Sequence, residues 1–201
     1  MKALILQGSL RPDGNTAALV KPFRRRMEAL GSDCTELFLN NMKLRSCIAC
    51  RCCQDNREQF GCIHDDDMQQ IFDLVLESDV MILATPIYSW YCTPPLKTVL
   101  DRLVYGMNKY YGKESASSVK STRKEKISLW KGKQVALITT CGYPLDRATE
   151  LWEEGIKRYC KHSQLQYIGM LAERFMGYDT VFMDAEKEKH AEEFADIICG
   201  I

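Results

Sequence analysis

The sequence lacks an excess of charge of either sign. Lysine and arginine number 27 together, aspartate and glutamate also number 27, and the formal net charge is zero. Proteins that bind nucleic acid or an acidic membrane surface through general electrostatics usually carry a basic excess. The composition therefore predicts neither a nucleic-acid partner nor a membrane partner.

A long apolar run is missing as well. The most apolar stretch, VMILATPIYSWYC, contains Pro86 and is shorter than the roughly 20 residues that span a bilayer. The first residues also lack the charged and apolar regions of a secretory signal. We therefore expect a cytoplasmic protein without a membrane-spanning segment.

Cysteine, in contrast, is abundant. The chain has 10 cysteines, and five of them fall between residues 47 and 62. Disulfide scaffolds of this size rarely concentrate their cysteines in one segment, whereas metal and redox sites do. The cluster indicates metal or redox chemistry.

Apolar runs alternate with helical patterns along the chain, which is typical of a parallel sheet covered by helices on both faces. The sequence thus predicts one α/β domain over residues 1–201, with three α/β/α layers. Aspartates 65–67 are expected to cap the second helix, and residues 106–132 to form a Lys/Ser-rich insertion. The expected strands are 2–7, 34–39, 79–85, 133–140 and 165–172, and the expected helices are 15–31, 65–78, 94–104, 146–161 and 184–199.

The segment GSLRPDGNT, residues 8–16, joins the first strand to the first helix. It matches neither G-x-G-x-x-G nor the lysine-containing P-loop. Ser9 and Thr16 offer hydroxyls, Asn15 an amide and Arg11 a guanidinium, and the helix start offers free N–H groups. We expect a site for a terminal phosphate that is held and not transferred. The alternative is an ordinary loop in which Asn15 or Thr16 caps the helix.

This segment resembles the G-S-x-R-x-x-G-N-T loop of the flavodoxin-like, NADPH-dependent FMN reductase family. A second family loop, Pro-x-Tyr-x followed by a Pro-Leu-Lys helix start, is similar to TPIYSWYCTPPLKTVLDRL at residues 85–103. The resemblance covers nearly the whole chain and is weakest over the insertion. It implies a flavodoxin-like five-stranded parallel sheet of order 2-1-3-4-5, FMN as cofactor and NAD(P)H as co-substrate.

The resemblance also implies the residues of an FMN site. No catalytic side chain is expected, because FMN itself performs the redox chemistry. Tyr88 and Trp90 could instead be lid or dimer-contact aromatics. The residues implied are Ser9, Arg11, Asn15 and Thr16 for the phosphate, Pro86, Ile87, Tyr88, Ser89 and Trp90 around the isoalloxazine, and Thr140, Cys141 and Gly142 as a third wall.

The clustered cysteines include a C-x₂-C-x₂-C motif made of Cys47, Cys50 and Cys53, followed after eight residues by Cys62. This resembles the compact cysteine motif of iron–sulfur flavoproteins, a branch of the same family that holds a [4Fe–4S] cluster near FMN. Three interpretations stay open: a [4Fe–4S] cluster, a set of redox-active thiols, and a tetrahedral zinc site. Cys52 is an extra thiol without an assigned role.

Other functional classes fit less well. Cys141 and Arg147 have the C-x₅-R spacing of a thiol phosphatase, but Pro144 removes a backbone donor and Asp146 adds negative charge. A phospho-accepting receiver domain needs an aspartate where the third strand reads LATP. A flavodoxin-type one-electron carrier is the main alternative, although flavodoxins are usually strongly acidic.

The sequence therefore predicts an FMN-dependent NAD(P)H oxidoreductase. The flavin would receive a hydride and pass electrons to a second acceptor, a small molecule or a protein, with the cluster as a possible outlet. The resemblance implies a homodimer or homotetramer. The basic residues between Lys109 and Lys133 are expected to form a solvated loop, with a dimer contact or a site for the NADPH 2′-phosphate as alternatives.

Overall fold

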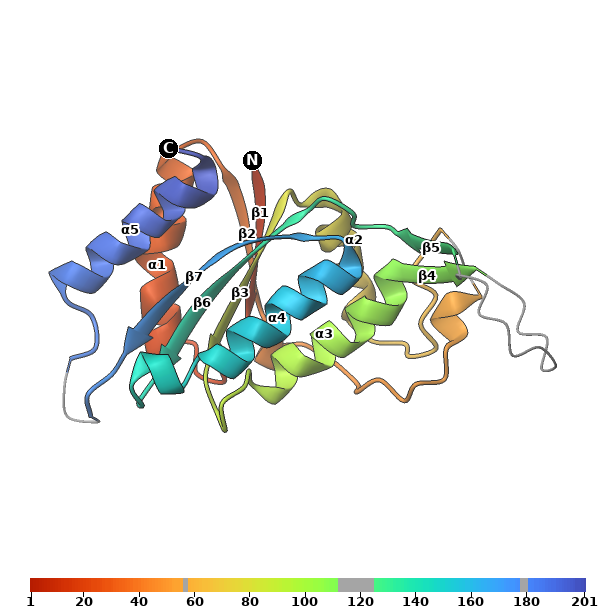
Figure 1. Cartoon of the computed structure of the whole chain (residues 1–201), viewed down its shortest axis with the longest axis horizontal. Helices are drawn as coiled ribbons and strands as arrows, with labels where there is room; N and C mark the ends of the chain where they lie inside the picture. Colours follow the sequence, from red (N-terminus) through yellow and green to blue (C-terminus); the bar gives the residue numbers. More distant parts are fainter. Residues whose placement is uncertain (56–57, 112–124, 178–180) are drawn as a thin grey trace.

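The computed structural model describes residues 1–55, 58–111, 125–177 and 181–201 (Figure 1). Its main sheet has five strands in the order β2-β1-β3-β6-β7, and every neighbouring pair is parallel. This is the expected order 2-1-3-4-5 in a flavodoxin-like fold. The strands are β1 (Lys2–Gln7), β2 (Asp33–Phe38), β3 (Val80–Pro86), β6 (Gln134–Cys141) and β7 (Gln166–Arg174).

Helices cover both faces of this sheet. Helices α1 (Asn15–Ala29) and α5 (Ala185–Cys199) lie together on one face. On the other face lie α2 (Met68–Glu77), α3 (Pro94–Met107) and α4 (Glu150–Ser163). Short 3₁₀ turns are η1 (Leu39–Asn41), η2 (Cys52–Gln54) and η3 (Leu145–Arg147).

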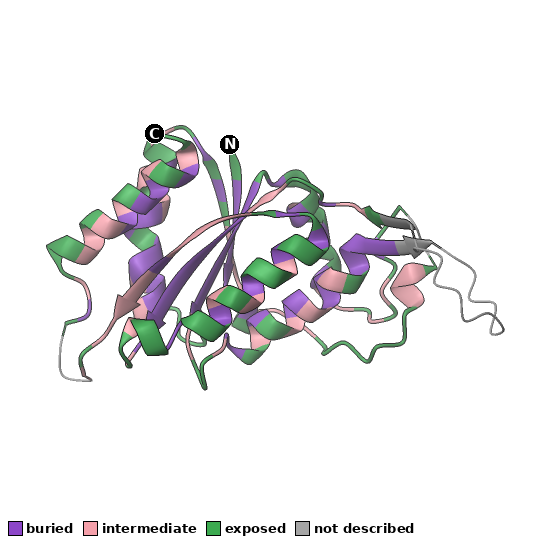
Figure 2. Ribbon diagram, in the orientation of Figure 1, coloured by how far each residue is buried: buried purple, intermediate pink, exposed green. Residues whose placement is uncertain are grey.

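The core is divided by the sheet into two apolar clusters. Along β1, Leu4 and Leu6 point into the cluster under α2, α3 and α4, whereas Ala3 and Ile5 point into the cluster under α1 and α5. Both faces of the central strands are therefore buried (Figure 2). A strand buried on both faces needs apolar residues at successive positions, which is why the sequence reads as continuous apolar runs.

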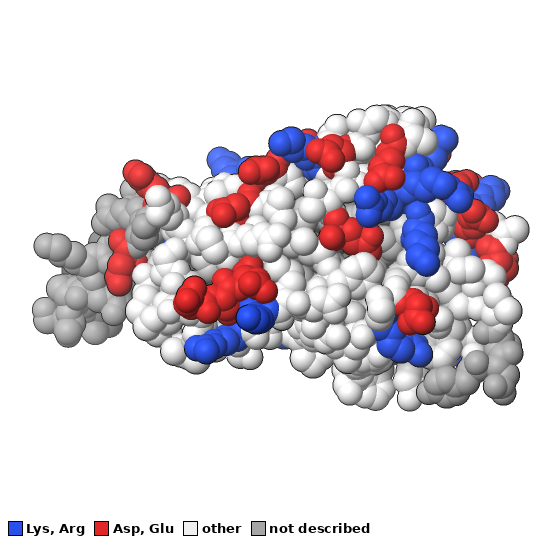
Figure 3. Space-filling model, turned by 180° about the vertical axis from the view of Figure 1, so that it is seen from behind, with Lys and Arg blue, Asp and Glu red and all other residues white. Residues whose placement is uncertain are grey.

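Charged side chains of α1 and α5 form ion pairs at the molecular surface. Arg25 of α1 contacts Glu188 and Glu192 of α5 at 2.7 and 2.8 Å, and Arg26 contacts Asp196 at 2.6 Å. In the view from behind, basic and acidic side chains are interspersed among other residues (Figure 3). Their local charges offset one another, in agreement with the zero net charge of the sequence.

The strand register brings three loops to one edge of the sheet. Gln7 at the end of β1 pairs with Ala84 of β3, and Pro86 pairs with Thr140 of β6. The segments that follow β1, β3 and β6 therefore begin side by side at the carboxyl edge, where ligands bind in open α/β sheets.

Both ends of the expected insertion at 106–132 form regular secondary structure. Helix α3 continues to Met107, and β4 (Asn108–Tyr111) pairs with β5 (Glu125–Ser128) in a separate antiparallel sheet. Lys109 is buried, and its Nζ donates to the carbonyls of Cys53 at 2.5 Å and Gln59 at 2.7 Å. The prediction of a solvated loop is wrong for Lys109, and residues 112–124 lie outside the described residues.

Of the three aspartates before α2, Asp66 and Asp67 bond mainly to other segments of the chain and not to the start of the helix. Asp67 is the N-cap residue but makes no side-chain cap bond, and its carboxylate accepts from the Lys43 backbone N–H at 2.7 Å. Asp66 accepts from Arg102 Nη1 at 2.6 Å and from Met68 N at only 3.3 Å. The expected capping role therefore reduces to one long bond, because these aspartates bind neighbouring segments instead.

No helix within the described ranges is both long enough and apolar enough to cross a membrane.

The packing of Phe60 on α3 gives a first testable prediction. A Cβ at Gly106 would lie 2.4 Å from two ring carbons of Phe60, and the Phe60 ring packs on Phe72 in a tilted arrangement with a centroid distance of 4.9 Å. Gly106→Ala gains roughly 0.5–1 kcal/mol of helix propensity, but overpacking a core costs roughly 1–3 kcal/mol. We expect net destabilisation, seen as a lower urea midpoint. Gly169→Ala is the control, because its Cβ meets only Phe194 at 3.5 Å; equal midpoints for both variants would contradict this.

Candidate functional site

The loop after β1 leaves the sheet in close contact with the start of α3. The Gly8 N–H donates to Ala84 O at 2.7 Å, and Thr93 Oγ1 donates to Gly8 O at 2.6 Å. A Cβ at position 8 would lie 2.8 Å from Thr93 Oγ1 and 2.9 Å from Leu96 Cβ. Glycine is therefore required here by the close approach of α3.

Ser9 shapes the rest of this loop. Its buried hydroxyl donates to Arg11 O at 2.9 Å and accepts from Arg11 N at 3.2 Å. The Arg11 side chain is exposed and Asn15 is half-buried. The loop thus has a fixed backbone, with a guanidinium free to reach a ligand beside it.

The first turn of α1 has no side-chain cap. Its N-cap residue is Gly14, which has no side chain to form a cap bond. The alternative in which Asn15 or Thr16 caps the helix is therefore wrong: the Thr16 hydroxyl instead shares a buried hydrogen bond of 2.7 Å with that of Thr140. Uncapped N–H groups and the positive end of the helix dipole together favour an anion.

The loop after β3 contains a tight turn with an unusual backbone. Tyr88 N donates to Tyr91 O at 3.0 Å, and Tyr91 N donates to Tyr88 O at 3.1 Å. The two central residues, Ser89 and Trp90, have φ of 49° and 62°. Left-handed conformations at both positions normally select glycine or asparagine, and such non-glycine positions recur at ligand clamps.

Trp90 joins this turn to the loop after β6. Its ring stacks on Tyr143 with a centroid distance of 6.3 Å and an interplanar angle of 17°, and its Nε1 donates to Arg147 O at 3.1 Å. Trp90 is 50% exposed and Tyr143 66%. The two rings form a flat, open aromatic surface at the carboxyl edge; the sequence analysis included Trp90 but missed Tyr143, although it directly follows the expected third wall.

The third wall consists mainly of backbone. Ile87 N donates to Thr140 O at 2.9 Å, which joins the ends of β3 and β6. Gly142 is half-buried, and a Cβ there would meet Phe175 at 3.2 Å. The Thr140 side chain is already paired with Thr16. The carbonyls of Cys141 and Gly142 accept from Phe175 N at 3.0 Å and from Arg174 Nε at 3.1 Å, so backbone contacts hold this wall in place.

The surroundings of the Cys141 thiol do not favour nucleophilic chemistry. It is buried and donates to Tyr143 O at 3.3 Å, and burial raises the pKa of the thiol. A nucleophilic cysteine needs a lowered pKa and an accessible thiolate. The arrangement therefore argues against the thiol phosphatase alternative.

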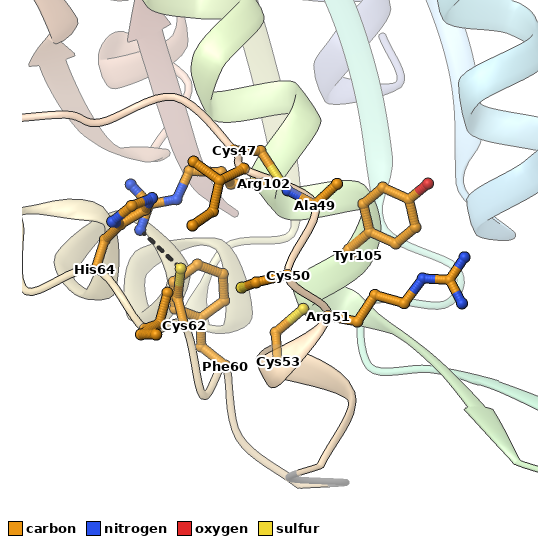
Figure 4. A pocket seen from close by; sticks show the side chains of 12 residues that line it. Cys47, Ala49, Cys50, Arg51, Cys53, Phe60, Cys62, His64, Arg102 and Tyr105 are labelled. Atoms are coloured by element: carbon orange, nitrogen blue, oxygen red, sulfur yellow. Dashed lines mark hydrogen bonds between the residues drawn. The ribbon is translucent and has the colours of Figure 1, made fainter.

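A cavity of about 150 Å³ lies between the cysteine-rich segment and α3 (Figure 4). Cys47 and Cys50 are exposed, whereas Cys53 and Cys62 are half-buried. Left-handed backbone at Ala49 (φ 55°) and Arg51 (φ 63°) turns the C-x₂-C-x₂-C segment around this cavity. Its lining includes all four motif cysteines, Cys47, Cys50, Cys53 and Cys62, together with Phe60, His64, Arg102 and Tyr105.

The thiols of the cavity differ in their surroundings. Cys52 donates to the Cys50 sulfur from its backbone N–H and its thiol, which lowers the pKa of Cys50. Burial raises the pKa of Cys53. In the described part of the chain, no three histidine, cysteine, aspartate or glutamate side chains are grouped closely enough to hold a metal ion. The four sulfurs thus share one cavity without converging on one point.

A buried cation lies against this cavity. Arg102 of α3 donates from Nη2 to Cys62 Sγ at 3.1 Å and from Nη1 to Asp66 at 2.6 Å. The exposed fractions of the Arg102 and Asp66 side chains are 1% and 3%. Arg102 was not among the site residues predicted from the sequence. Its position three residues after Val99 places it on the buried face of the helix, and that position could have indicated a buried charge.

Known proteins resemble this chain in sequence. A family model described as NADPH-dependent FMN reductase matches residues 1–151. An iron–sulfur flavoprotein of Archaeoglobus fulgidus is 34% identical over 107 residues, or 53% of this chain and 47% of the relative. One from Methanosarcina thermophila is 30% identical over 104 residues, or 52% and 53%. The chain matches about half the length of these curated relatives.

Solved structures support the fold. An azoreductase from Bacillus anthracis has a TM-score of 0.69 at 15% identity, covering 98% of this chain and 99% of that one. An FMN-dependent NADH-azoreductase from the same species, in complex with FMN, has a TM-score of 0.66 at 12% identity, covering 99% and 97%. At such low identity the likeness supports the fold alone.

The Thr16–Thr140 hydrogen bond gives a second prediction. In the ligand-free protein, Thr16→Val leaves the Thr140 hydroxyl buried without this partner, which costs about 1–3 kcal/mol. The double variant Thr16→Val/Thr140→Val removes both groups and should recover much of that loss. Urea unfolding of the four proteins measures the coupling; strictly additive losses would contradict a direct hydrogen bond.

Proposed function

The chain belongs to the NADPH-dependent FMN reductase family, and from this premise we propose that it is an FMN-dependent oxidoreductase that takes electrons from NAD(P)H and passes them to a second acceptor. The observation that carries the proposal is the uncapped start of α1, beside a fixed loop with the exposed Arg11. Such a site would bind a phosphate without transferring it, because residues 8–16 lack the lysine of a P-loop.

In this proposal the phosphate of FMN is held by the first loop. The N–H groups at the start of α1 donate to phosphate oxygens, and Arg11 adds a charge-assisted bond from its guanidinium. Ser9 keeps the loop in shape through its two bonds with Arg11. Asn15 is half-buried at the helix start and adds a side-chain amide, while Thr16 positions the helix against β6.

The isoalloxazine would lie along the loops after β3 and β6. When bound, FMN would supply the redox chemistry, and the protein would supply binding, orientation and electrostatics. Pro86, Ile87 and the Tyr88–Trp90 turn form one border, and the backbone at residues 140–142 forms the other. The Trp90 hydrogen bond to Arg147 O holds these borders at a fixed separation.

We further propose that Cys47, Cys50, Cys53 and Cys62 hold a [4Fe–4S] cluster. The donor set is four thiols, as such clusters require. The cavity of about 150 Å³ is about ten times the roughly 10–15 Å³ that one water needs, so it has room for a group of several atoms. Loading would draw the four sulfurs together, in keeping with metal binding that is coupled to folding.

The proposal extends to assembly and compartment. None of the 10 cysteines forms a disulfide, which suits a reducing compartment such as the cytoplasm. The exposed rings of Tyr88, Trp90 and Tyr143 form an apolar edge that a second copy of the chain would cover in a homodimer or homotetramer.

Replacing Arg11 tests the phosphate loop. A hydrogen bond to a charged group contributes about 1.5–3 kcal/mol, so Arg11→Ala should weaken FMN binding by roughly 10- to 100-fold. Fluorescence titration of the flavin-free protein measures the affinity. Lys21→Ala is the control, since Lys21 is exposed on the same helix but further from its start; an unchanged affinity in Arg11→Ala would overturn the loop assignment.

A pair of cysteine variants tests the metal proposal. Cys50→Ser removes a motif ligand, whereas Cys52→Ser removes a neighbouring thiol outside the motif. Purified without oxygen, Cys50→Ser should lose its iron and sulfide while FMN binding persists, and Cys52→Ser should keep both. Zinc without sulfide in the wild-type protein would support the zinc site, and no metal at all would support redox-active thiols.

A further inference from the structure

We propose that Arg102 is a positioning residue that raises the reduction potential of the group held at Cys62, and that Asp66 opposes this effect. The inference rests on the proposed [4Fe–4S] cluster and concerns residues outside the cysteine motif. Among the charged groups on α3, Arg102 combines deep burial with direct contact to a motif sulfur.

The guanidinium is fixed by several contacts. Nη1 donates to Asp66 Oδ2 at 2.6 Å and to Arg45 O at 3.2 Å, which leaves Nη2 directed at Cys62 Sγ at 3.1 Å. The guanidinium carbon also lies 5.7 Å from the centre of the Phe60 ring. Figure 4 shows the dashed Arg102–Cys62 bond at the edge of the cavity.

Burying this ion pair needs an explanation beyond stability. A buried pair often contributes no more to stability than apolar residues of the same volume would. The Arg102 Nε also remains buried without a hydrogen-bond partner, which adds a cost. A guanidinium that is buried despite this cost, and that donates a hydrogen bond to the Cys62 sulfur, fits a role in the electrostatics of the cavity.

The direction of the effect follows from charge. Reduction adds one negative charge to the cluster and its thiolate ligands, and a hydrogen bond and a cation at Cys62 stabilise that added charge. The reduced state is therefore favoured and the potential is higher. The Asp66 carboxylate partly cancels the cation, so its removal should raise the potential further.

The test is a midpoint titration of the cluster, made after iron and sulfide are assayed on anaerobic protein. Reduction by dithionite is followed by electron paramagnetic resonance at controlled potential. We expect Arg102→Gln to lower the ratio of reduced to oxidised cluster about tenfold at fixed potential, or about 59 mV for one electron. Asp66→Asn should shift the midpoint in the opposite direction.

Two further variants guard against misfolding and unspecific charge effects. Arg102→Gln leaves Asp66 buried without its partner, which is destabilising. The double variant Arg102→Gln/Asp66→Asn removes both charges together. It should still lower the potential, because the bond to Cys62 is lost. Lys97→Gln removes a cation from the same helix, but the Lys97 side chain is 46% exposed. Solvent screens such a charge, and the midpoint should not move.

The outcomes separate this inference from the function on which it rests. Stoichiometric iron and sulfide with opposite shifts in the arginine and aspartate variants support it. Intact clusters with unchanged midpoints, or shifts of the same sign in all variants, would overturn the role of Arg102. They would leave the proposed [4Fe–4S] cluster unaffected. Wild-type protein without iron and sulfide overturns the cluster and this inference together.

Discussion

The buried ion pair between Arg102 and Asp66 is the contact on which the arrangement of the cysteine-rich segment depends. Through Arg102, α3 holds the backbone at Arg45, the carboxylate before α2 and the sulfur of Cys62. Loss of one partner would leave a buried charge, at a cost of about 3–5 kcal/mol, and would release three separate segments at once. Together with the bonds from Lys109 of β4 to the carbonyls of Cys53 and Gln59, these contacts hold the cysteine-rich segment from outside it.

The same helix also contacts the other candidate site. Thr93 and Leu96, at the start of α3, pack on Gly8 of the phosphate loop. From Thr93 to Arg102 the helix rises about 14 Å at roughly 1.5 Å per residue. The proposed flavin and cluster sites therefore lie at two ends of one rigid element, which fixes their separation without a dedicated linker.

Most of the fold could be predicted from the sequence, because strands buried on both faces require continuous apolar runs. A phosphate-binding role for the loop after β1 could be proposed from the sequence, because the candidate residues are neighbours along the chain. The Arg102–Asp66 pair could not, since its members are 36 residues apart and a single aspartate or arginine usually reads as a solvated charge. Lys109 was misassigned for the same reason: its acceptors are backbone carbonyls of a distant segment.

The turn at Ser89 and Trp90 shows a different limit. Local preferences at these positions favour glycine, so the left-handed backbone is visible only once the indole of Trp90 is known to bond Arg147 O and to stack on Tyr143. Tertiary contacts here override the local preference. Tyr143 was missed because its importance depends on that contact.

The uncapped first turn of α1 also has a consequence for the lifetime of the protein in the cell. A ligand that binds only the folded chain adds about 2.7 kcal/mol of stability at a hundred times its dissociation constant. Chains made when that ligand is scarce unfold more often and are more readily degraded. Under the proposed function, this missing cap would tie the abundance of the protein to the supply of the ligand that binds there.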